Sequence, residues 1–317
     1  MAYILLIVGF TLLIKGAGYF VDGSSNIARL LQVPPILIGL TIVAFGTSSP
    51  EATVSIIAAL EGTADVAVGN VVGSNIFNIT LVVGVAAILY PLKVESETIR
   101  KEIPFTLLAS VALFILMSDI VLQGFSNNVI SRGDGFIFML FLSIFMYYVI
   151  EIGLKSRKNA INEPAPENIH WGKNILITIL GLAAIIFGGD LVVDNGTKIA
   201  YSLGMSETLV GLTIIAIGTS LPELVTSITA ALKKESEIAL GNIVGSNIFN
   251  ILFVLGTSAI ISPLAVNDKV LIDVVFMIVL TVVLLIFSRT GFKIGKREGM
   301  VLVAVYIIYL VYIILRN

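Results

Sequence analysis

The sequence predicts an all-α integral membrane protein, with ten transmembrane helices arranged as two inverted five-helix repeats. Of its 317 residues, 57% are hydrophobic and only 13% are charged, which leaves too few polar side chains to cover a soluble domain. The charged residues fall between apolar runs of roughly 20 residues, the length that crosses about 30 Å of hydrocarbon. A long segment of the first half also recurs in the second half, and this duplication predicts the two repeats.

Ten apolar runs follow one another along the chain. Continuous runs of this length favour helices over barrel strands, which would be short and alternating. The first run lacks a basic leading segment, so we expect it to be a membrane helix and not a removable signal peptide. The predicted spans are 2–20, 35–60, 66–91, 103–124, 134–154, 173–193, 207–232, 238–263, 270–288 and 299–315.

A polar segment, residues 155–173, separates the spans into two sets of five. Its Pro, Asn and charged residues predict a flexible linker between a first repeat, 1–154, and a second, inverted repeat, 174–317. If the N-terminus is external, the cytoplasmic loops hold about 14 Lys and Arg and the external ones about 4, as the preference of basic residues for the cytoplasmic side requires. The sequence therefore predicts a protein of the cell membrane with both termini external and the linker cytoplasmic.

A short motif that contains a proline and a glutamate interrupts two of the apolar spans. Gly46–Glu51 reads GTSSPE, and Gly218–Glu223 reads GTSLPE, 172 residues further on. Each motif is followed by a GNxVGSNIFNI segment, and from Gly39 to Ile79 roughly 26 of 41 residues are identical to their partners. Because five spans per half is an odd number, the second copy enters the membrane from the opposite side. Function is expected where the copies meet.

The chemistry of the motif points to cations. Pro50 and Pro222 lack an N–H, which frees backbone carbonyls of the preceding turn. Glu51 and Glu223 would each cost about 2.5 to 3.5 kcal/mol near the bilayer centre, and no Lys or Arg in the middle of the neighbouring spans could pair with them. The nearby side chains offer hydroxyl and amide oxygens, without His or Cys. This is the ligand set of a hard cation such as calcium or sodium.

Other repeated residues suggest structural roles. Gly69, Gly73, Gly241 and Gly245 are expected to let neighbouring helices approach closely. Asp22 and Asp194 also lie 172 residues apart, and we expect them at helix ends, capped or solvated. The other acids near span ends, Asp119, Asp190 and Asp273, are expected to be interfacial.

The paired motifs, each with its GNxVGSNIFN sequel, resemble the two alpha-repeats of the sodium/calcium exchanger family, within the cation/calcium antiporter superfamily. The resemblance implies one ion-binding cluster between spans 2, 3, 7 and 8, where Glu51 and Glu223 bridge calcium and sodium sites. It also implies that spans 1 and 6 slide across this core to alternate access. The further metal ligands it implies are the carbonyls of Thr47 and Thr219 for calcium, then Ser48, Ser74, Ser220 and Ser246 with the carbonyls of Ala44 and Ala216 for sodium, and Asn78 and Asn250 as neutral residues at the centre.

The function implied is secondary active exchange of sodium for calcium, electrogenic and independent of potassium. The protein is then not an enzyme and needs no cofactor; its partners are the calcium and sodium ions and the lipid bilayer, with no nucleic acid or protein partner implied. Some relatives carry Asp where Asn250 stands, an acid associated with potassium co-transport, so asparagine in both copies argues against potassium. A proton/calcium antiporter and a potassium-dependent sodium/calcium antiporter remain the alternatives.

Two functions of other classes are more distant. A cation channel could also use carbonyls and acids, but an inverted repeat with broken helices favours alternating access. An intramembrane hydrolase with Glu51 and Glu223 as an acid/base pair would need a nucleophile or a metal-activated water. The chain has no Cys and no HExxH motif, so the sequence supplies neither.

Overall fold

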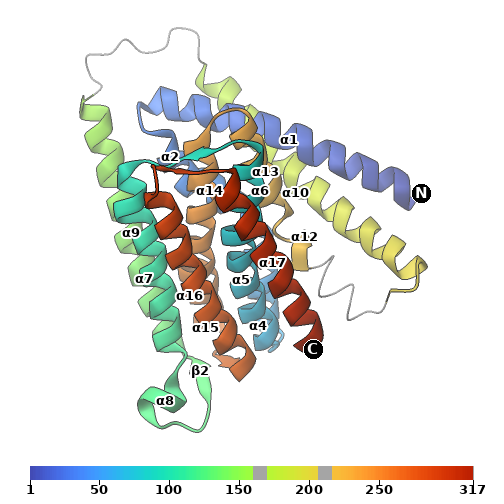
Figure 1. Cartoon of the computed structure of the whole chain (residues 1–317), viewed down its shortest axis with the longest axis vertical. Helices are drawn as coiled ribbons and strands as arrows, with labels where there is room; N and C mark the ends of the chain where they lie inside the picture. The colour runs from blue at the N-terminus through green and yellow to red at the C-terminus, as the bar shows by residue number, and fades with distance from the viewer. Residues whose placement is uncertain (160–169, 206–215, 317) are drawn as a thin grey trace.

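The computed structural model describes residues 1–159, 170–205 and 216–316, and helices make up most of them (Figure 1). The all-α prediction is confirmed. The first half contains α1 (Ala2–Leu31), α2 (Pro35–Ile38), η1 (Gly39–Val43), α3 (Ala44–Thr47), α4 (Ser49–Leu60), α5 (Ala64–Phe77), η2 (Asn78–Val82), α6 (Val83–Leu89), η3 (Thr98–Glu102), α7 (Ile103–Leu116), α8 (Asp119–Gln123) and α9 (Arg132–Asn159), where η denotes a π-helical turn.

The described part of the second half follows a similar order, without counterparts of η3 and α8. Two short antiparallel ladders join the halves: β1 (Leu92–Lys93) pairs with β4 (Lys293–Ile294), and β2 (Asn128–Ile130) pairs with β3 (Leu264–Val266). The helices of this half are α10 (Trp171–Ser202), α12 (Ala216–Gly218), α13 (Leu221–Leu232), α14 (Ser236–Phe249), η5 (Asn250–Leu255), α15 (Gly256–Ile261), α16 (Asp268–Arg289) and α17 (Lys296–Arg316).

Most of the predicted spans appear as long apolar helices. Among the described residues, seven helices are long and apolar enough to cross a membrane, and the pair 35–47 and 49–60, bent by 49°, makes an eighth if it counts as one span. The predicted span 103–124 is instead the 14-residue helix α7 followed by the short α8. The predicted span 207–232 lies partly outside the described residues. The count of ten spans therefore stays a prediction.

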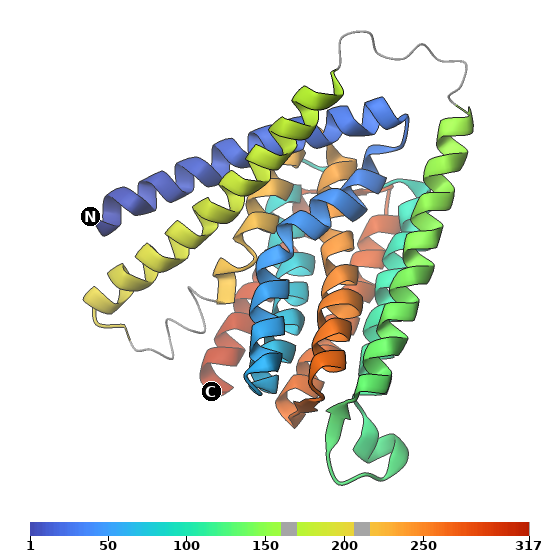
Figure 2. The same ribbon diagram turned by 180° about the vertical axis from the view of Figure 1, so that it is seen from behind.

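Helices α1 and α10 lie side by side and run in opposite directions, tilted across the outside of the other helices (Figures 1 and 2). Glycines make this close packing possible: a Cβ atom on Gly16 would lie 2.9 Å from the Gly181 carbonyl oxygen, and one on Gly188 would lie 2.8 Å from the Gly9 carbonyl oxygen. The two helices thus form one packed pair, and α1 contacts the core through α13.

Both helices of this pair are longer than predicted, because hydropathy missed the polar turns that continue them. Asp22 and Asp194, predicted at helix ends, lie well inside α1 and α10. The polar end of α1 is stable because it has partners: Lys233 Nζ pairs with Asp22 at 2.6 Å and donates to the Gly18 carbonyl at 2.7 Å. This contact ties α1 to the turn between α13 and α14.

A second contact at the same turn strengthens the tie. The Ser25 hydroxyl donates to Glu235 Oε1 at 2.8 Å, and Arg29 lies 3.5 Å from the same oxygen. Helix α1 then ends at Gln32, whose left-handed backbone (φ 56°) stops the helix shortly before Pro34. Helices α9 and α10 likewise extend into the predicted linker, covering 155–159 and 171–173, while residues 160–169 lie outside the described structure.

Candidate cation-binding site

Each copy of the repeated motif breaks its helix at a serine. Ser48 (φ −79°, ψ 6°) separates α3 from α4, and Ser220 (φ −91°, ψ 6°) precedes α13. Pro50 and Pro222 occupy the second position of the new helices, where a missing N–H costs no helical hydrogen bond. The break therefore places the glutamate that follows each proline in the first turn of a new helix, inside the protein.

The two glutamates are fully buried, and serines of the opposite repeat hold them. The Ser220 hydroxyl donates to Glu51 Oε1 at 2.9 Å, and the Ser48 hydroxyl donates to Glu223 Oε1 at 2.9 Å. Neither carboxylate has an ion-pair partner in the part of the chain that the structure describes. The structure thus brings both breaks together, with each repeat supplying a donor for the acid of the other.

The serines of the following helices complete the carboxylate surroundings. Ser74 of α5 donates to Glu51 Oε1 at 3.5 Å, and Ser246 of α14 donates to Glu223 Oε1 at 3.4 Å. The Ser220 and Ser74 hydroxyl oxygens lie 3.0 Å apart. All four predicted serines therefore lie around the two glutamates, as hydroxyl oxygens that can turn from donating to a carboxylate to binding a cation.

The two threonines of the motif contact asparagines of the other repeat. Thr47 donates to Asn242 Oδ1 at 2.9 Å, and Thr219 donates to Asn70 Oδ1 at 3.4 Å. These asparagines in turn donate to glutamate backbones: Asn70 Nδ2 lies 3.2 Å from the Glu51 carbonyl oxygen and Asn242 Nδ2 lies 3.5 Å from that of Glu223. The threonine side chains thus brace the site.

The central asparagines also cross between the repeats. Asn78 begins the π-helical turn η2 and donates to Asn247 Oδ1 at 3.3 Å, while Asn250 begins η5 and donates to Asn75 Oδ1 at 3.1 Å. Asn75 Nδ2 further donates to the Asn247 carbonyl at 3.2 Å. We did not predict Asn75 and Asn247 from the sequence, although both stand in the duplicated GSNIFN segment, so listing every polar residue of that segment would have found them.

The hydrogen bond made by the serine N–H at the break differs between the copies. The Ala44 carbonyl, which the resemblance implies as a sodium ligand, accepts from the Ser48 N–H at 3.0 Å, and the Thr47 hydroxyl oxygen lies 3.3 Å from it. In the second copy the Ser220 N–H instead donates to the Ile217 carbonyl, at 3.2 Å. Ala216 begins α12, so its backbone reaches the same break from the N-terminal side.

Four buried oxygens at this site have no hydrogen-bond donor among the described residues: Glu51 Oε2, Glu223 Oε2, Asn78 Oδ1 and Asn250 Oδ1. A buried acceptor without a donor costs about 1 to 3 kcal/mol, and more when it is charged. Two carboxylate and two amide oxygens with adjacent hydroxyls suit a hard cation. Within the described residues no group of three or more His, Cys, Asp or Glu side chains is arranged to hold a metal ion, so at this site two carboxylates carry the charge.

The glycines of the two GNxVGSN segments differ, contrary to the prediction. Gly241 and Gly245 pack closely: a Cβ atom on Gly245 would lie 2.7 Å from Ala44 Cβ. Gly69 and Gly73 do not, because a Cβ atom on either would meet nothing within 4 Å. Instead they line a cavity of about 480 Å³ that also touches three site residues, Asn70, Ser74 and Thr219. This cavity therefore borders the site on the α5 side, while the α14 side is closed by packing.

A second cavity approaches the breaks from the side of α10. It has a volume of about 570 Å³, and its walls include both prolines of the motif, Pro50 and Pro222, together with Thr219. Asp190 and Asp194 of α10 also line it, so acids predicted to be interfacial or solvated face a path toward the site. Thr219 and Val54 contribute to the walls of both cavities.

Comparison with known proteins agrees with this geometry. The family model described as sodium/calcium exchanger protein matches residues 1–151 and 173–315. The chain is 41% identical to the putative antiporter CaxA of Alkalimonas amylolytica, covering 97% of both chains, and 34% identical to the sodium/calcium exchanger MaX1 of Methanosarcina acetivorans, covering 98% of this chain and 97% of MaX1. A solved structure of the sodium-calcium exchanger NCX_Mj, soaked with Na⁺ and Sr²⁺, superposes with a TM-score of 0.85 at 30% identity, covering 98% of this chain and 97% of that one.

Proposed function

The chain belongs to the sodium/calcium exchanger family, and from this premise we propose that it exchanges several sodium ions for one calcium ion by alternating access. Membership makes it an integral membrane protein and a cation/calcium antiporter, and its named relatives are exchangers and antiporters, not enzymes. Sodium as the counter-ion, independence from potassium and net charge movement are the parts we add. The proposed ligands are the glutamates, threonines, serines, asparagines and alanines of the two motifs.

One observation carries this proposal. Glu51 and Glu223 are buried at the contact between two repeats, each with one carboxylate oxygen that lacks a donor among the described residues. Two negative charges can balance one calcium ion, or two of three sodium ions with the third held by neutral hydroxyl, amide and carbonyl oxygens. The same ligand set can therefore serve either ion in turn, which is the requirement for antiport.

Two features support alternating access. Cavities approach the site past Ser74 and past Pro50, whereas Gly241 and Gly245 close the facing side against Gly39 and Ala44. The packed pair of α1 and α10 lies across the outside of this core, where its movement could open one side and close the other. Because the repeats are inverted, an exchange of their shapes would turn one open side into the other.

Potassium independence rests on the centre of the site. Asn78 and Asn250 are buried there and neutral, and the described residues place no third acid beside Glu51 and Glu223. A cycle that moves three sodium ions against one calcium ion then transfers one net charge. One charge moving through 100 mV corresponds to about 2.3 kcal/mol.

We expect a sodium gradient alone to drive calcium uptake into proteoliposomes that contain no potassium. One charge moving through ~60 mV corresponds to about 1.4 kcal/mol, which is a factor of ten in an equilibrium ratio. Each ~60 mV of membrane potential should therefore change the ratio of inside to outside calcium reached at equilibrium about tenfold. Calcium-45 flux is measured at equal pH on both sides, with the voltage set by a chloride pathway. An absolute need for potassium, uptake driven equally by a proton gradient, or an equilibrium indifferent to voltage would each contradict the proposal.

The proposed orientation has its own test. The chain contains no cysteine, so single cysteines can be placed without background. A cysteine at position 160 or 165 of the linker should react with a membrane-impermeant maleimide only from the cytoplasm, and one at position 2 or 317 only from outside, because basic residues concentrate on the linker side. Labelling of linker cysteines in intact cells would reverse the orientation.

A further inference from the structure

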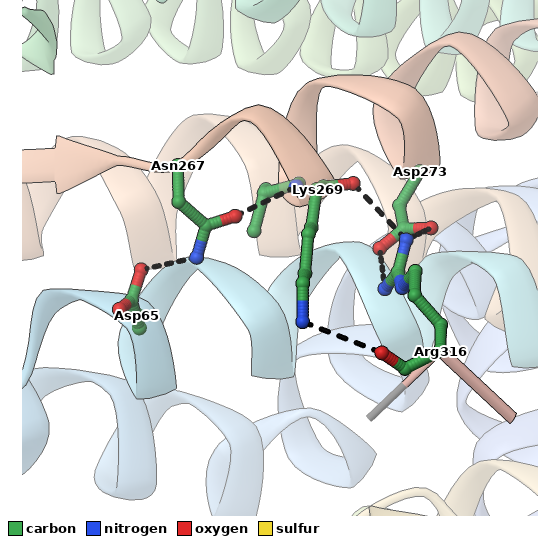
Figure 3. A network of polar contacts seen from close by, with 6 residues as sticks. Asp65, Asn267, Lys269, Asp273 and Arg316 are labelled. Carbon is green, nitrogen blue, oxygen red and sulfur yellow. Dashed lines mark hydrogen bonds and ion pairs between the residues drawn. The ribbon is translucent and has the colours of Figure 1, made fainter. Parts of the chain in front are cut away.

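The cavity that reaches Ser74 and Asn70 has a charged wall at some distance from the glutamates. This wall is formed by the N-terminal part of α5, the N-terminal part of α16 and the last turn of α17, as Figure 3 shows. The residues that line it and form a polar network are Asp65, Asn267, Lys269, Asp273 and Arg316. An ion that enters through this cavity therefore passes these groups before it meets the site.

The strongest contact in the network is the ion pair between Asp273 and Arg316. Arg316 Nη1 lies 2.9 Å from Asp273 Oδ1, and Nη2 lies 2.8 Å from Oδ2, so the pair is bidentate. The two side chains are only 10% and 16% exposed. The two charges are thus held next to each other and compensate each other.

Further contacts hold the arginine in this geometry. Its guanidinium lies 5.1 Å from the centre of the Tyr312 ring, and Nη1 also donates to the Lys269 carbonyl at 3.3 Å. Lys269 Nζ donates in return to the Arg316 carbonyl at 3.5 Å. The other acid of the wall, Asp65, accepts from Asn267 Nδ2 at 2.9 Å. Asp273 is thus compensated by a cation, and the lining of this entrance as a whole balances two acids, Asp65 and Asp273, against Lys269 and Arg316.

The duplicated scaffold does not dictate this charge pattern. The positions related to Asp273 and Asp65 by the 172-residue offset hold Lys101 and Glu237. The last helices match at an offset of 164, because Gly299 packs against Gly84 as Gly135 packs against Gly256, so the position related to Arg316 holds Ile152. Lys101 and Glu237 line a different cavity, of about 470 Å³, whose walls also include Glu95, Glu97 and Glu102. One cavity is therefore rich in acids, and its repeat-related counterpart carries a balanced pair instead.

We propose that the Asp273–Arg316 pair is a specificity-determining element of exchange, which keeps the potential of this entrance near neutral and thereby limits its preference for divalent over monovalent cations. The Coulomb energy of an ion is proportional to its charge, so any potential acts twice as strongly on calcium as on sodium. A potential that changes the local sodium concentration by some factor changes that of calcium by the square of the factor. The charge balance of this wall therefore determines the ratio of calcium to sodium concentration at the entrance.

This inference rests on the proposed sodium/calcium exchange and gives opposite signs for the two halves of the pair. Arg316→Gln leaves the negative Asp273, so we expect the KM for calcium on the C-terminal side to fall about fourfold and that for sodium about twofold. Asp273→Asn leaves the positive Arg316 and should raise both by the same factors. These factors correspond to a unit charge acting over roughly 10 Å in aqueous surroundings. The double variant should lie within about twofold of the original chain.

The experiment measures calcium-45 and sodium-22 flux in proteoliposomes at pH 8, with calcium or sodium varied on one side at a time. KM values for the opposite side should not change, the shifts should shrink when ionic strength is raised with choline chloride, and Arg316→Lys should behave like the original chain. Thermal unfolding in detergent shows whether each variant is folded.

The possible outcomes separate this inference from the proposed function. Single variants that shift KM in the same direction, a double variant that is no closer to the original chain, or shifts equal for sodium and calcium would overturn the inference, because a structural role predicts those results. Absence of sodium-driven calcium flux in the unmodified protein would overturn the proposed function instead. If Arg316→Gln does not fold, Asp273→Asn and its rescue by the double variant still decide the question.

Discussion

Replacing Glu51 or Glu223 with glutamine is expected to lower calcium exchange at least a hundredfold while leaving the protein folded. Glutamine keeps the shape of the side chain and can still accept from Ser220 or Ser48, the donors that lie 2.9 Å from Oε1 of each acid. It removes one of the two charges that would balance a calcium ion, and about 2.7 kcal/mol of lost binding already corresponds to a hundredfold change. Calcium-45 uptake in proteoliposomes and isothermal calcium titration measure both consequences.

The control is Glu151→Gln, which changes an exposed acid in α9 that lies outside the site and its cavities. This variant should transport calcium at the rate of the original chain. Thermal unfolding in detergent should be unchanged, or shifted upward, for all three variants, since removal of a buried charge without an ion-pair partner does not cost stability. Transport near the original rate in either buried variant would remove that glutamate from the site.

Replacing Gly245 with valine should have the second large effect, on the fold itself. The new Cβ atom would lie 2.7 Å from Ala44 Cβ and 2.8 Å from the backbone of Leu40, so α14 would have to move away from η1 and α3. Overpacking of this kind costs about 1 to 3 kcal/mol, and more where backbone must shift. The contact between Thr47 and Asn242 crosses the same interface, so we expect loss of transport together with a lowered unfolding temperature.

The repeat supplies a control at the equivalent position. Gly73→Val introduces the same atoms where nothing lies within 4 Å, so the unfolding temperature should stay close to that of the original chain. Transport by this variant should slow, because Gly73 lines the cavity that leads to Ser74. Equal destabilisation by the two substitutions, measured by thermal unfolding monitored with size-exclusion chromatography, would contradict the difference in packing between α5 and α14.

Hydropathy predicted most of the helices but not their polar continuations. α1 and α10 extend past the predicted spans, because contacts such as Asp22 with Lys233 join residues that are distant in sequence and give no local apolar signal. The span 103–124 was predicted as one helix, whereas α7 ends at Leu116 before the separate helix α8. Length and apolarity indicate that a segment is helical; partners elsewhere in the fold determine where it ends.

The sequence predicted which residues make up the candidate site, but not which of them contact one another. Duplication of the motif singled out Glu51 and Glu223, yet it could not show that Ser48 donates to the glutamate of the other repeat, since that depends on how the helices face each other. The pairing of Asp273 with Arg316 was missed for the same reason: 43 residues separate them, and neither has an equivalent in the other repeat. Contacts that follow the internal symmetry could be anticipated from one copy, and contacts that break it could not.

The tie between α1 and the turn at Lys233 has an energetic consequence for the proposed cycle. The partially exposed pair of Asp22 and Lys233 contributes about 0.2 to 1 kcal/mol to the arrangement seen in the structure. If the two repeats exchange conformations in the cycle, the contact between Asp22 and Lys233 is replaced by one between the positions 172 residues away, Asp194 and Glu61. These are two acids, which repel each other. This contact alone therefore favours the arrangement described over its repeat-related counterpart, by a factor of about five at most.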